Sequence, residues 1–317
     1  MSKTSLLSEE ILTLIMSHIG SLSQLQECRL VCKAWCNPGL IIMLGQEITL
    51  KSELGIFRLY DLLVKDPSRG YLVKHLVFNI GDECSFVLKE LLCLILTPNI
   101  ETIKGDVSNE GFYVEFNKVI KRWPTRFRKV QQMTSCSEYS EEVAYRCAKD
   151  LSQFVCLTSL KMEGWYEHLS SLEEILKYCP HLQELSLNIH EESDDVLEPP
   201  AVMDWATSTI EERQYNLKNL SIQSSCPADY LEYLFYKYPN IESISIDIEL
   251  DGDYIEINMD RIMRLIKDVP RKHISFTVAA ELDFREIVQG LKAYSYSILI
   301  DNVLENGDFQ LILAPMM

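Results

Sequence analysis

A short apolar pattern recurs through most of this chain and limits the folds that it can adopt. The pattern is L-x-x-L-x-L, where L is any large apolar residue, and nine segments fill at least two of its three L positions: VKHLVF, IETIKG, FRKVQQ, LTSLKM, LQELSL, LKNLSI, IESISI, RKHISF and SYSILI. From Val73 to Ser295, where the first and last segments begin, successive segments start 27, 27, 30, 25, 35, 24, 30 and 24 residues apart. A repeat of this period is typical of a solenoid. The pattern therefore predicts a series of strand–helix units with α/β structure.

Prolines mark the beginning of several of these segments. Pro98, Pro180 and Pro239 each stand two residues before the first position of a segment. Proline ends a preceding helix and favours extended backbone around it. These prolines support the division into repeats, and an unrelated α/β fold of strand–helix units is the alternative.

The composition indicates a folded protein of one or two domains. The chain has 317 residues, of which 47% are hydrophobic. Its apolar runs are too short for a membrane span, and its first residues lack the pattern of a signal peptide. We therefore expect a soluble intracellular protein, in the cytoplasm, the nucleus or both, with no membrane partner.

The net charge of −17 is unevenly distributed along the chain. Residues 1–130 carry 16 basic and 14 acidic side chains, whereas residues 131–317 carry 14 basic and 33 acidic ones. An acidic C-terminal half repels phosphate groups, which argues against nucleic acid as a partner.

The cysteines indicate packing rather than metal binding. The chain has ten of them and no CxxC pair. Cys28, Cys32 and Cys36 are four residues apart, which places them along one face if they share a helix. No second Cys or His cluster completes a tetrahedral site. We therefore predict reduced, buried thiols and no metal.

Residues 51–70 form a short connector. In SELGIFRLYDLLVKD, apolar residues recur at helical spacing, and the stretch ends in the turn residues Asp66-Pro67-Ser68-Arg69-Gly70. This segment predicts one amphipathic helix followed by a turn.

The first 50 residues, which we call the head, read as short helices with excess apolar surface. In Leu7-Ser8-Glu9-Glu10-Ile11-Leu12, Ser8 is a suitable helix cap. An apolar face follows at Ile11, Leu12, Ile15 and Ile19, and Gly20 ends this helix. The second part is LQECRLVCKAW. Two short helices cannot bury all of these side chains between them, so apolar area remains for a partner.

The head resembles an F-box, with Ser8 where that family usually has proline and with the ending Val-Cys-Lys-x-Trp. The string KYCPHLQELSL is similar to the cysteine-containing leucine-rich repeats that often follow F-boxes. The resemblance implies an all-helical F-box at 1–50, the connector at 51–70, and an irregular leucine-rich-repeat solenoid at 71–317. In such a solenoid parallel strands line the concave side and helices the convex side.

The resemblance also implies a function, which is recognition of substrates for a Skp–cullin–F-box ubiquitin ligase. The F-box docks on the Skp-type adaptor, and the adaptor binds the cullin. Carried onto this chain, the adaptor-binding residues are Leu7, Ile11, Leu12, Ile15, Leu25, Val31 and Trp35. The alternatives are a Skp-binding adaptor outside any ligase, or a plain leucine-rich-repeat scaffold whose head is only a cap.

The x positions of the repeats predict a basic stripe on the concave side. The candidate substrate-binding residues are Lys74, Lys104, Arg128, Lys129, Lys161 and Lys218. Such a stripe would bind a protein target through an acidic or phosphorylated segment. Alternatively these are solvated charges without a role. We predict no cofactor, although a polyphosphorylated inositol on this face is left open.

Two acidic segments are explained more simply as a loop and a hairpin than as ligand-binding sites. HEESDDVLEPP at 190–200 predicts a solvated loop. IDIELDGDYIEI resembles a calcium loop, but Asn258 stands where a bidentate Glu is needed. The alternating apolar residues around Asp251-Gly252 favour a β-hairpin.

No catalytic residues are predicted. The chain has no P-loop, GxSxG or HExxH motif, and its six histidines are scattered. We therefore expect a non-catalytic subunit.

Overall fold

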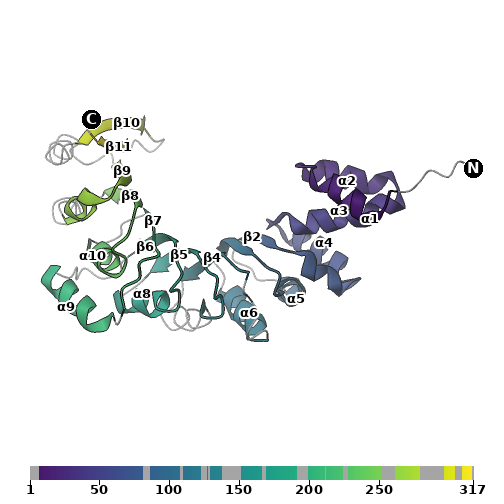
Figure 1. Ribbon diagram of the computed structural model, residues 1–317, viewed down its shortest axis with the longest axis horizontal. Coiled ribbons are helices and arrows are strands. Elements are labelled where there is room, and N and C mark those ends of the chain that lie inside the picture. The colour runs from purple at the N-terminus through teal and green to yellow at the C-terminus, as the bar shows by residue number, and fades with distance from the viewer. Residues whose placement is uncertain are drawn as a thin grey trace, which may run out of the picture. The chain divides into compact units, whose positions relative to one another are not determined.

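The computed structural model describes residues 7–80, 86–107, 110–122, 127, 129–137, 151–165, 169–190, 199–210, 212–223, 228–250, 261–278, 296–303 and 309–315. The chain divides into two compact units. The N-terminal unit comprises Met1–Met133 with Gln153–Cys156, and the C-terminal unit comprises Thr134–Ser152 with Leu157–Met317. Helices alternate with strands (Figure 1), and most of the eleven described strands pair in parallel. The prediction of an α/β fold is confirmed.

Three helices open the N-terminal unit: α1 (Glu9–Ser17), α2 (Leu22–Val31) and α3 (Lys33–Gly45). Helix α3 packs against both α1 and α2. The buried apolar side chains of the head are Leu12, Met16, Leu25, Leu40 and Leu44. Gly39 allows the close approach of α3 to α2, because a Cβ atom there would lie 2.5 Å from Cγ of Arg29.

The cysteines of the head are arranged differently from the prediction. Cys32 has extended backbone, with φ −163° and ψ 166°, and it separates α2 from α3. Cys28, Cys32 and Cys36 therefore do not share one helix, and the four-residue spacing carries no information across the break. Cys32 and Cys36 are exposed, as is Cys156 further along the chain, so the prediction of buried thiols is wrong for these three, whereas Cys179 is buried.

The rest of the N-terminal unit alternates strands and helices. Its strands are β1 (Glu47–Leu50), β2 (His75–Ile80) and β3 (Thr102–Val107), paired in parallel in that order, and β3 pairs in parallel with Gln132 and Met133, the first two residues of β4 (Gln132–Ser137). Between them lie α4 (Glu53–Val64), the 3-10 turn η1 (Pro67–Leu72), α5 (Phe86–Ile95) and α6 (Glu110–Lys121). The predicted connector helix is confirmed by α4. Strand β1 was not predicted, because four residues at the end of a helical segment show too short an alternation.

The C-terminal unit contains five parallel strands followed by two antiparallel ones. The parallel strands are β5 (Ser159–Trp165), β6 (Glu184–His190), β7 (Asn219–Gln223), β8 (Ser243–Leu250) and β9 (Arg271–Val278). Their connections contain α8 (Leu169–Leu176), α9 (Pro199–Thr209), α10 (Ala228–Lys237) and the 3-10 turn η3 (Ile266–Asp268). The strands β10 (Tyr296–Val303) and β11 (Phe309–Pro315) complete the order β5-β6-β7-β8-β9-β11-β10.

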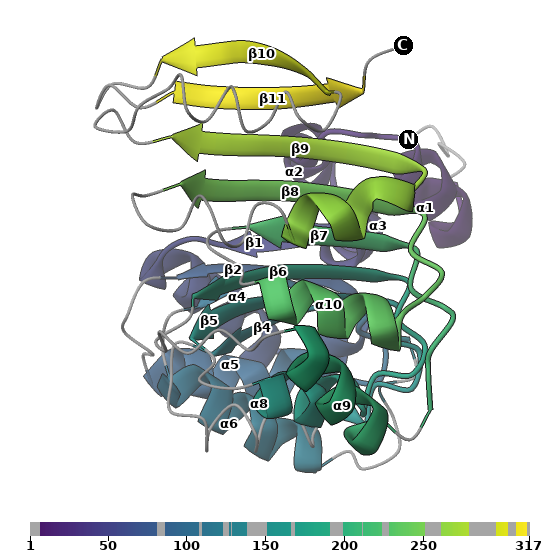
Figure 2. The same ribbon diagram turned by 90° about the vertical axis from the view of Figure 1, so that its left-hand side faces the viewer.

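Apolar and polar side chains alternate along these parallel strands. In β7, Leu220 and Ile222 are buried, whereas Asn219 and Gln223 are exposed. Helices α8, α9 and α10 lie on one face of the strands (Figure 2), and the buried side chains form the core beneath them. The opposite face, which no described helix of this unit covers, is called the open face below.

The strand pairing corrects the register of two predicted repeats. Met133 pairs with Ile103, so the third repeat begins at Val130 and not at Phe127. Ile274 pairs with Ile246, so the repeat of β9 begins two residues earlier than the pattern RKHISF implied. Both errors arose because neighbouring apolar residues offered a second match at a wrong offset.

The last predicted repeat, SYSILI, is not part of the parallel series. Strand β10 pairs antiparallel with β11, and β11 pairs antiparallel with β9. The apolar alternation of β10 predicted a strand correctly but contained no information on its direction. The predicted solenoid of parallel strands to residue 317 therefore stops at β9 within the described residues.

The other segment predictions have mixed outcomes. Helices α5, α8 and α10 end before Pro98, Pro180 and Pro239, as predicted. The hairpin and calcium readings at Asp251-Gly252 lie outside the described residues, as does most of the acidic segment at 190–200.

Candidate functional site

Helix α1 presents an apolar stripe to the surface. The Ser8 hydroxyl caps the helix by accepting a hydrogen bond from the Ile11 N–H at 3.4 Å, as predicted. A backbone hydrogen bond and one from Ser8 lower the pKa of Glu10, so the first turn is negatively charged at neutral pH. The exposed apolar side chains of this region are Leu7, Ile11, Leu14 and Ile15. The spacing of Ile11, Leu14 and Ile15 places these three along one side of the helix, and Leu7 precedes the Ser8 cap.

Helix α2 also exposes apolar side chains. Leu22 is 43% exposed, Leu30 is 85% exposed and Val31 is 64% exposed. Leu22 and Leu30 are eight residues apart and so lie on the same side of α2. Folding of the head leaves these side chains in water, although it buries Leu25 of the same helix completely.

The seven predicted adaptor-binding residues separate into three groups. Four are exposed: Leu7, Ile11, Ile15 and Val31. Trp35 is half-buried. Leu12 and Leu25 are buried in the head at 3% and 0% exposure, so the structure corrects their role from surface contact to support. Their helical positions face α3, which the sequence analysis did not separate from α2.

The sequence analysis missed three exposed apolar residues of the head: Leu14, Leu22 and Leu30. A signal for them existed in the sequence. Leu14 lies three positions after Ile11, and Leu22 and Leu30 share a helix side, so a helical projection could have grouped them. What it could not supply was which side of each helix faces α3.

Polar contacts between the helices hold the head together. The Asn37 side chain on α3 donates a hydrogen bond to the Glu9 carboxylate on α1. The Arg29 guanidinium on α2 lies 3.7 Å from Sδ of Met43 on α3. These contacts lie at the helix interfaces and leave the exposed stripes of α1 and α2 accessible.

Carboxylates neutralise much of the predicted basic stripe. Lys74 Nζ lies 3.1 Å from Glu101, and Lys104 Nζ lies 3.9 Å from Glu47. Lys218 Nζ lies 3.0 Å from Glu242 in the same way. Glu101 and Glu242 each stand just before the strand next to that of their lysine, whereas Glu47 on β1 lies two strands from Lys104 on β3, with β2 between them.

The remaining members of the predicted stripe are separated. Lys129 donates a hydrogen bond to Asn99 Oδ1 at 3.0 Å. Lys161 is half-buried on β5, and Arg128 lies outside the described residues. Lys74, Lys104 and Lys129 belong to the N-terminal unit, whereas Lys161 and Lys218 belong to the C-terminal unit. The five described members of the predicted stripe are therefore divided between the two units.

The open face of the C-terminal unit is instead lined by small polar groups. Ser186, Ser221 and Ser245 are paired across β6, β7 and β8 and form one row. Lys161 stands next to Ser186 in this row, and His273 stands next to Ser245. Hydroxyl and amide groups can form hydrogen bonds with an extended chain without charge selection.

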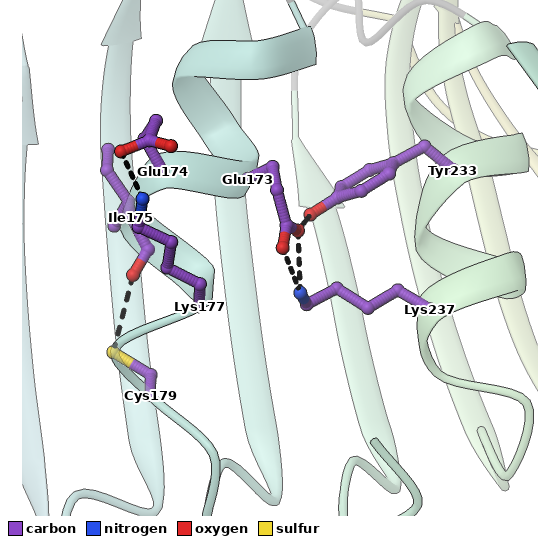
Figure 3. Close-up of polar contacts among 7 residues, drawn as sticks. All are labelled: Glu173, Glu174, Ile175, Lys177, Cys179, Tyr233 and Lys237. Carbon is purple, nitrogen blue, oxygen red and sulfur yellow. Dashed lines mark hydrogen bonds and ion pairs between the residues drawn. The ribbon is translucent and has the colours of Figure 1, made fainter. Parts of the chain in front are cut away.

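A buried charged cluster lies on the helical side of the same unit (Figure 3). Lys237 Nζ on α10 donates to both carboxylate oxygens of Glu173 on α8, at 2.8 Å and 2.6 Å. The Tyr233 hydroxyl donates to the same carboxylate at 2.5 Å. All three side chains are buried, which makes this cluster a structural contact rather than a site for a ligand.

Burial dominates the titration of this cluster. It lowers the pKa of Lys237, against the opposing effect of Glu173. It raises the pKa of Tyr233 and of Tyr238 well above their usual value. It also raises the pKa of the Cys179 thiol to about 12.

The described part of the chain contains no cluster of three or more His, Cys, Asp or Glu side chains that could hold a metal ion. None of its helices combines the length and the apolar character needed to cross a membrane.

Comparison with known proteins provides no relative for this chain. No protein-family model matches it, and a search of curated proteins finds no match.

Proposed function

We propose that this chain is the substrate-recognition subunit of a Skp–cullin–F-box ubiquitin ligase. Its head acts as an F-box that docks on a Skp-type adaptor, and its strand–helix repeats act as leucine-rich repeats that hold a protein target. The observation that carries the proposal is the pair of exposed apolar stripes on α1 and α2. They lie on a head whose sequence order resembles that of an F-box, with Ser8 capping α1 where that family usually has proline.

Burial of the exposed stripes supplies the driving force for docking. A large apolar side chain contributes about 1.5–3 kcal/mol when it is removed fully from water. Ile11, Ile15 and Leu30 together thus supply several kcal/mol toward the cost of association. Leu12 and Leu25 contribute indirectly, because they hold the helices that present the stripes.

The repeats provide the second contact. The open face offers the Ser186, Ser221 and Ser245 hydroxyls to a target, and the nearby Lys218 is paired with Glu242. We therefore propose a protein target bound largely through hydrogen bonds. Binding of an acidic or phosphorylated segment of the target remains a prediction. It requires Lys74, Lys104 or Lys218 to leave its present carboxylate partner and pair with the target instead.

The mechanism is one of proximity. A target held on the repeats while the head is docked is kept near the ubiquitin-charged enzyme, which raises its effective concentration there. The bond-forming chemistry belongs to the partner enzymes, and this chain positions the substrate, in the cytoplasm or the nucleus.

The test is co-purification of the chain with the adaptor and a cullin. Ile11→Asp with Ile15→Asp places two charges in the α1 stripe without changing the core, and we expect adaptor recovery to fall at least about tenfold, which corresponds to about 1.4 kcal/mol. Leu54→Asp is the matched control, because Leu54 on α4 is exposed at 60% but lies outside the head.

The proteins recovered with the chain distinguish between the possible functions of the head. Adaptor together with cullin supports the ligase proposal. Adaptor without cullin identifies a Skp-binding adaptor outside a ligase. Equal adaptor recovery by the double variant and the unmodified chain contradicts docking through the α1 stripe.

A further inference from the structure

The parallel strands of the C-terminal unit have nearly interchangeable sequences. Strands β6, β7 and β8 contain Leu185-Ser186-Leu187, Leu220-Ser221-Ile222 and Ile244-Ser245-Ile246. A shift of one strand by two residues keeps every apolar side chain on the same face, so the apolar pattern alone specifies the register weakly.

The pair of β8 and β9 shows this ambiguity most clearly. In the structure Ile244 pairs with Lys272, and Ile246 pairs with Ile274. The observed register also pairs Ile248 with Phe276 and Leu250 with Val278. A two-residue shift would pair Ile244 with Ile274 and Ile246 with Phe276, and so would also keep apolar residues opposite one another. The apolar pattern of RKHISF predicted this shifted alignment. The apolar pairs therefore do not by themselves exclude it.

A buried ion pair joins the two helical segments that precede these strands. Arg261 Nη2 lies 2.8 Å from Glu232 Oε2, and Arg261 Nε donates to Glu232 Oε1 at 3.2 Å. The Arg261 side chain is 12% exposed and the Glu232 side chain 10%. This two-point contact requires one relative position of the guanidinium and the carboxylate.

Both partners lie on helical segments that lead into their strands. Residues 261–265 are helical and continue through η3 and Pro270 into β9. Glu232 lies on α10, and the Tyr238 N–H donates to the Leu234 carbonyl at 2.8 Å as the chain turns toward β8. A two-residue shift of β9 moves its segment by about 7 Å, well beyond hydrogen-bonding distance.

We propose that the buried ion pair between Glu232 and Arg261 selects the register of β8 and β9. Breaking it would leave a charge buried without its partner, a penalty that the shifted alignment cannot avoid. The buried pair of Glu173 and Lys237 likewise joins α8 to α10, the helices that precede β6 and β8 in the chain (Figure 3). The register is a property of the C-terminal unit alone and holds whether or not the head binds an adaptor.

Disulfide trapping on the open face tests this proposal. Ser245→Cys with His273→Cys reports the observed register, because these residues are directly paired. Ser243→Cys with His273→Cys reports the shifted register, because these residues are diagonal neighbours in the structure, at about 7–8 Å, too far for an unstrained disulfide. Peptide mapping by mass spectrometry distinguishes these bonds from those of the native cysteines.

The decisive variant is Glu232→Leu with Arg261→Met, which keeps the bulk of both side chains but removes both charges. We expect the ratio of shifted to observed cross-link to rise about tenfold or more, as when about 1.4 kcal/mol of preference is lost. Glu232→Arg with Arg261→Glu, which restores a pair with reversed polarity, should return the ratio toward its original value.

The matched control is Glu174→Leu with Lys177→Met, which removes an ion pair from the surface of α8 (Figure 3). Its cross-link ratio should equal that of the unmodified chain. A folded Glu232→Leu/Arg261→Met variant with an unchanged ratio overturns the proposal. If that variant does not fold, Arg261→Lys, which keeps the charge but not the two-point geometry, decides in its place, and an unchanged ratio again overturns it.

Discussion

The two units of this protein differ in whether their unusual residues are exposed or buried. Of the large apolar side chains that are exposed among the described residues, fourteen lie in the N-terminal unit and three in the C-terminal unit. The buried charged residues of the described chain show the reverse distribution: Glu173, Asp229, Glu232 and Lys237 all belong to the C-terminal unit.

This contrast separates two tasks. Apolar side chains left in water give the N-terminal unit a means of association, since their burial is favourable only when a partner arrives. Charges taken out of water contribute little to stability, but they penalise every arrangement that separates them. The first unit is thus suited to docking, and the second to keeping one arrangement among several similar ones.

Lys237→Met gives the largest expected effect and tests the contrast through the buried charges of the C-terminal unit. It leaves the Glu173 carboxylate buried without its cation, and we expect a loss of about 3–5 kcal/mol in the free energy of unfolding. Urea denaturation followed by circular dichroism measures the loss. Lys177→Met, on the exposed pair with Glu174, should change stability by no more than about 0.5 kcal/mol. Equal effects of the two would remove the distinction between buried and exposed pairs.

Leu25→Ala tests the same contrast in the head. Leu25 is fully buried, so its truncation should cost about 2–5 kcal/mol of stability. Leu30→Ala, on the exposed side of the same helix, should cost no more than about 0.5 kcal/mol and yet weaken adaptor binding. Thermal denaturation and a binding assay on both variants check this. A stable Leu25→Ala variant would show that the head lacks the core described here.

Alkaline pH should destabilise the C-terminal unit. The thiol of Cys179 ionises near 9.0 when unfolded but near 12 when folded, so its stabilising contribution is complete below pH 9 and is lost as the pH rises toward 12. Tyr233 and Tyr238, whose pKa values burial also raises, add to this loss above pH 10. Burial lowers the pKa of Lys237, so this one group acts in the direction opposite to that of Cys179, Tyr233 and Tyr238.

Urea midpoints measured from pH 8 to pH 11 check this dependence. The midpoint should fall over this range, and Cys179→Ala should make the fall shallower between pH 9 and pH 10, where the tyrosines contribute little. A midpoint that does not depend on pH would contradict the burial of these groups.

The smallest effect is expected at the paired lysines of the predicted basic stripe. Lys218 and Glu242 are more than half exposed, at 55% and 53%. A double-mutant cycle with alanine at both positions should give a coupling of about 0.2–1 kcal/mol. The coupling should decrease in 1 M salt, where the Debye length is about 3 Å. A coupling that is insensitive to salt would mean that the pair is less solvated than its exposure indicates.

Most secondary structure could be predicted from local patterns, and the register could not. The spacing of apolar residues predicted α4 and the strands from β2 to β9, and Ser8 was correctly identified as a cap. The same pattern misplaced the repeats of β4 and β9, because Phe127 and Phe276 are buried apolar residues at a plausible but wrong offset.

The candidate site divides in the same way. Exposed Ile11, Ile15 and Val31 could be identified from the resemblance, whereas buried Leu12 and Leu25 could not be told apart from them. The ion pairs of the predicted basic stripe could not be foreseen for a related reason. The carboxylates of Glu47, Glu101 and Glu242 lie 24 to 57 positions from the lysines that they neutralise, and only strand pairing brings them together.

By itself the sequence determined the class of fold, the alternation of strands and helices, and the apolar excess of the head. These depend on the period of side chains along a few turns or strands, which is a local property. The tertiary structure decided which leucines of the head face solvent, where β10 and β11 reverse the direction of the sheet, and which charges are buried in pairs. Each of these depends on residues distant in the chain, whose approach no local pattern specifies.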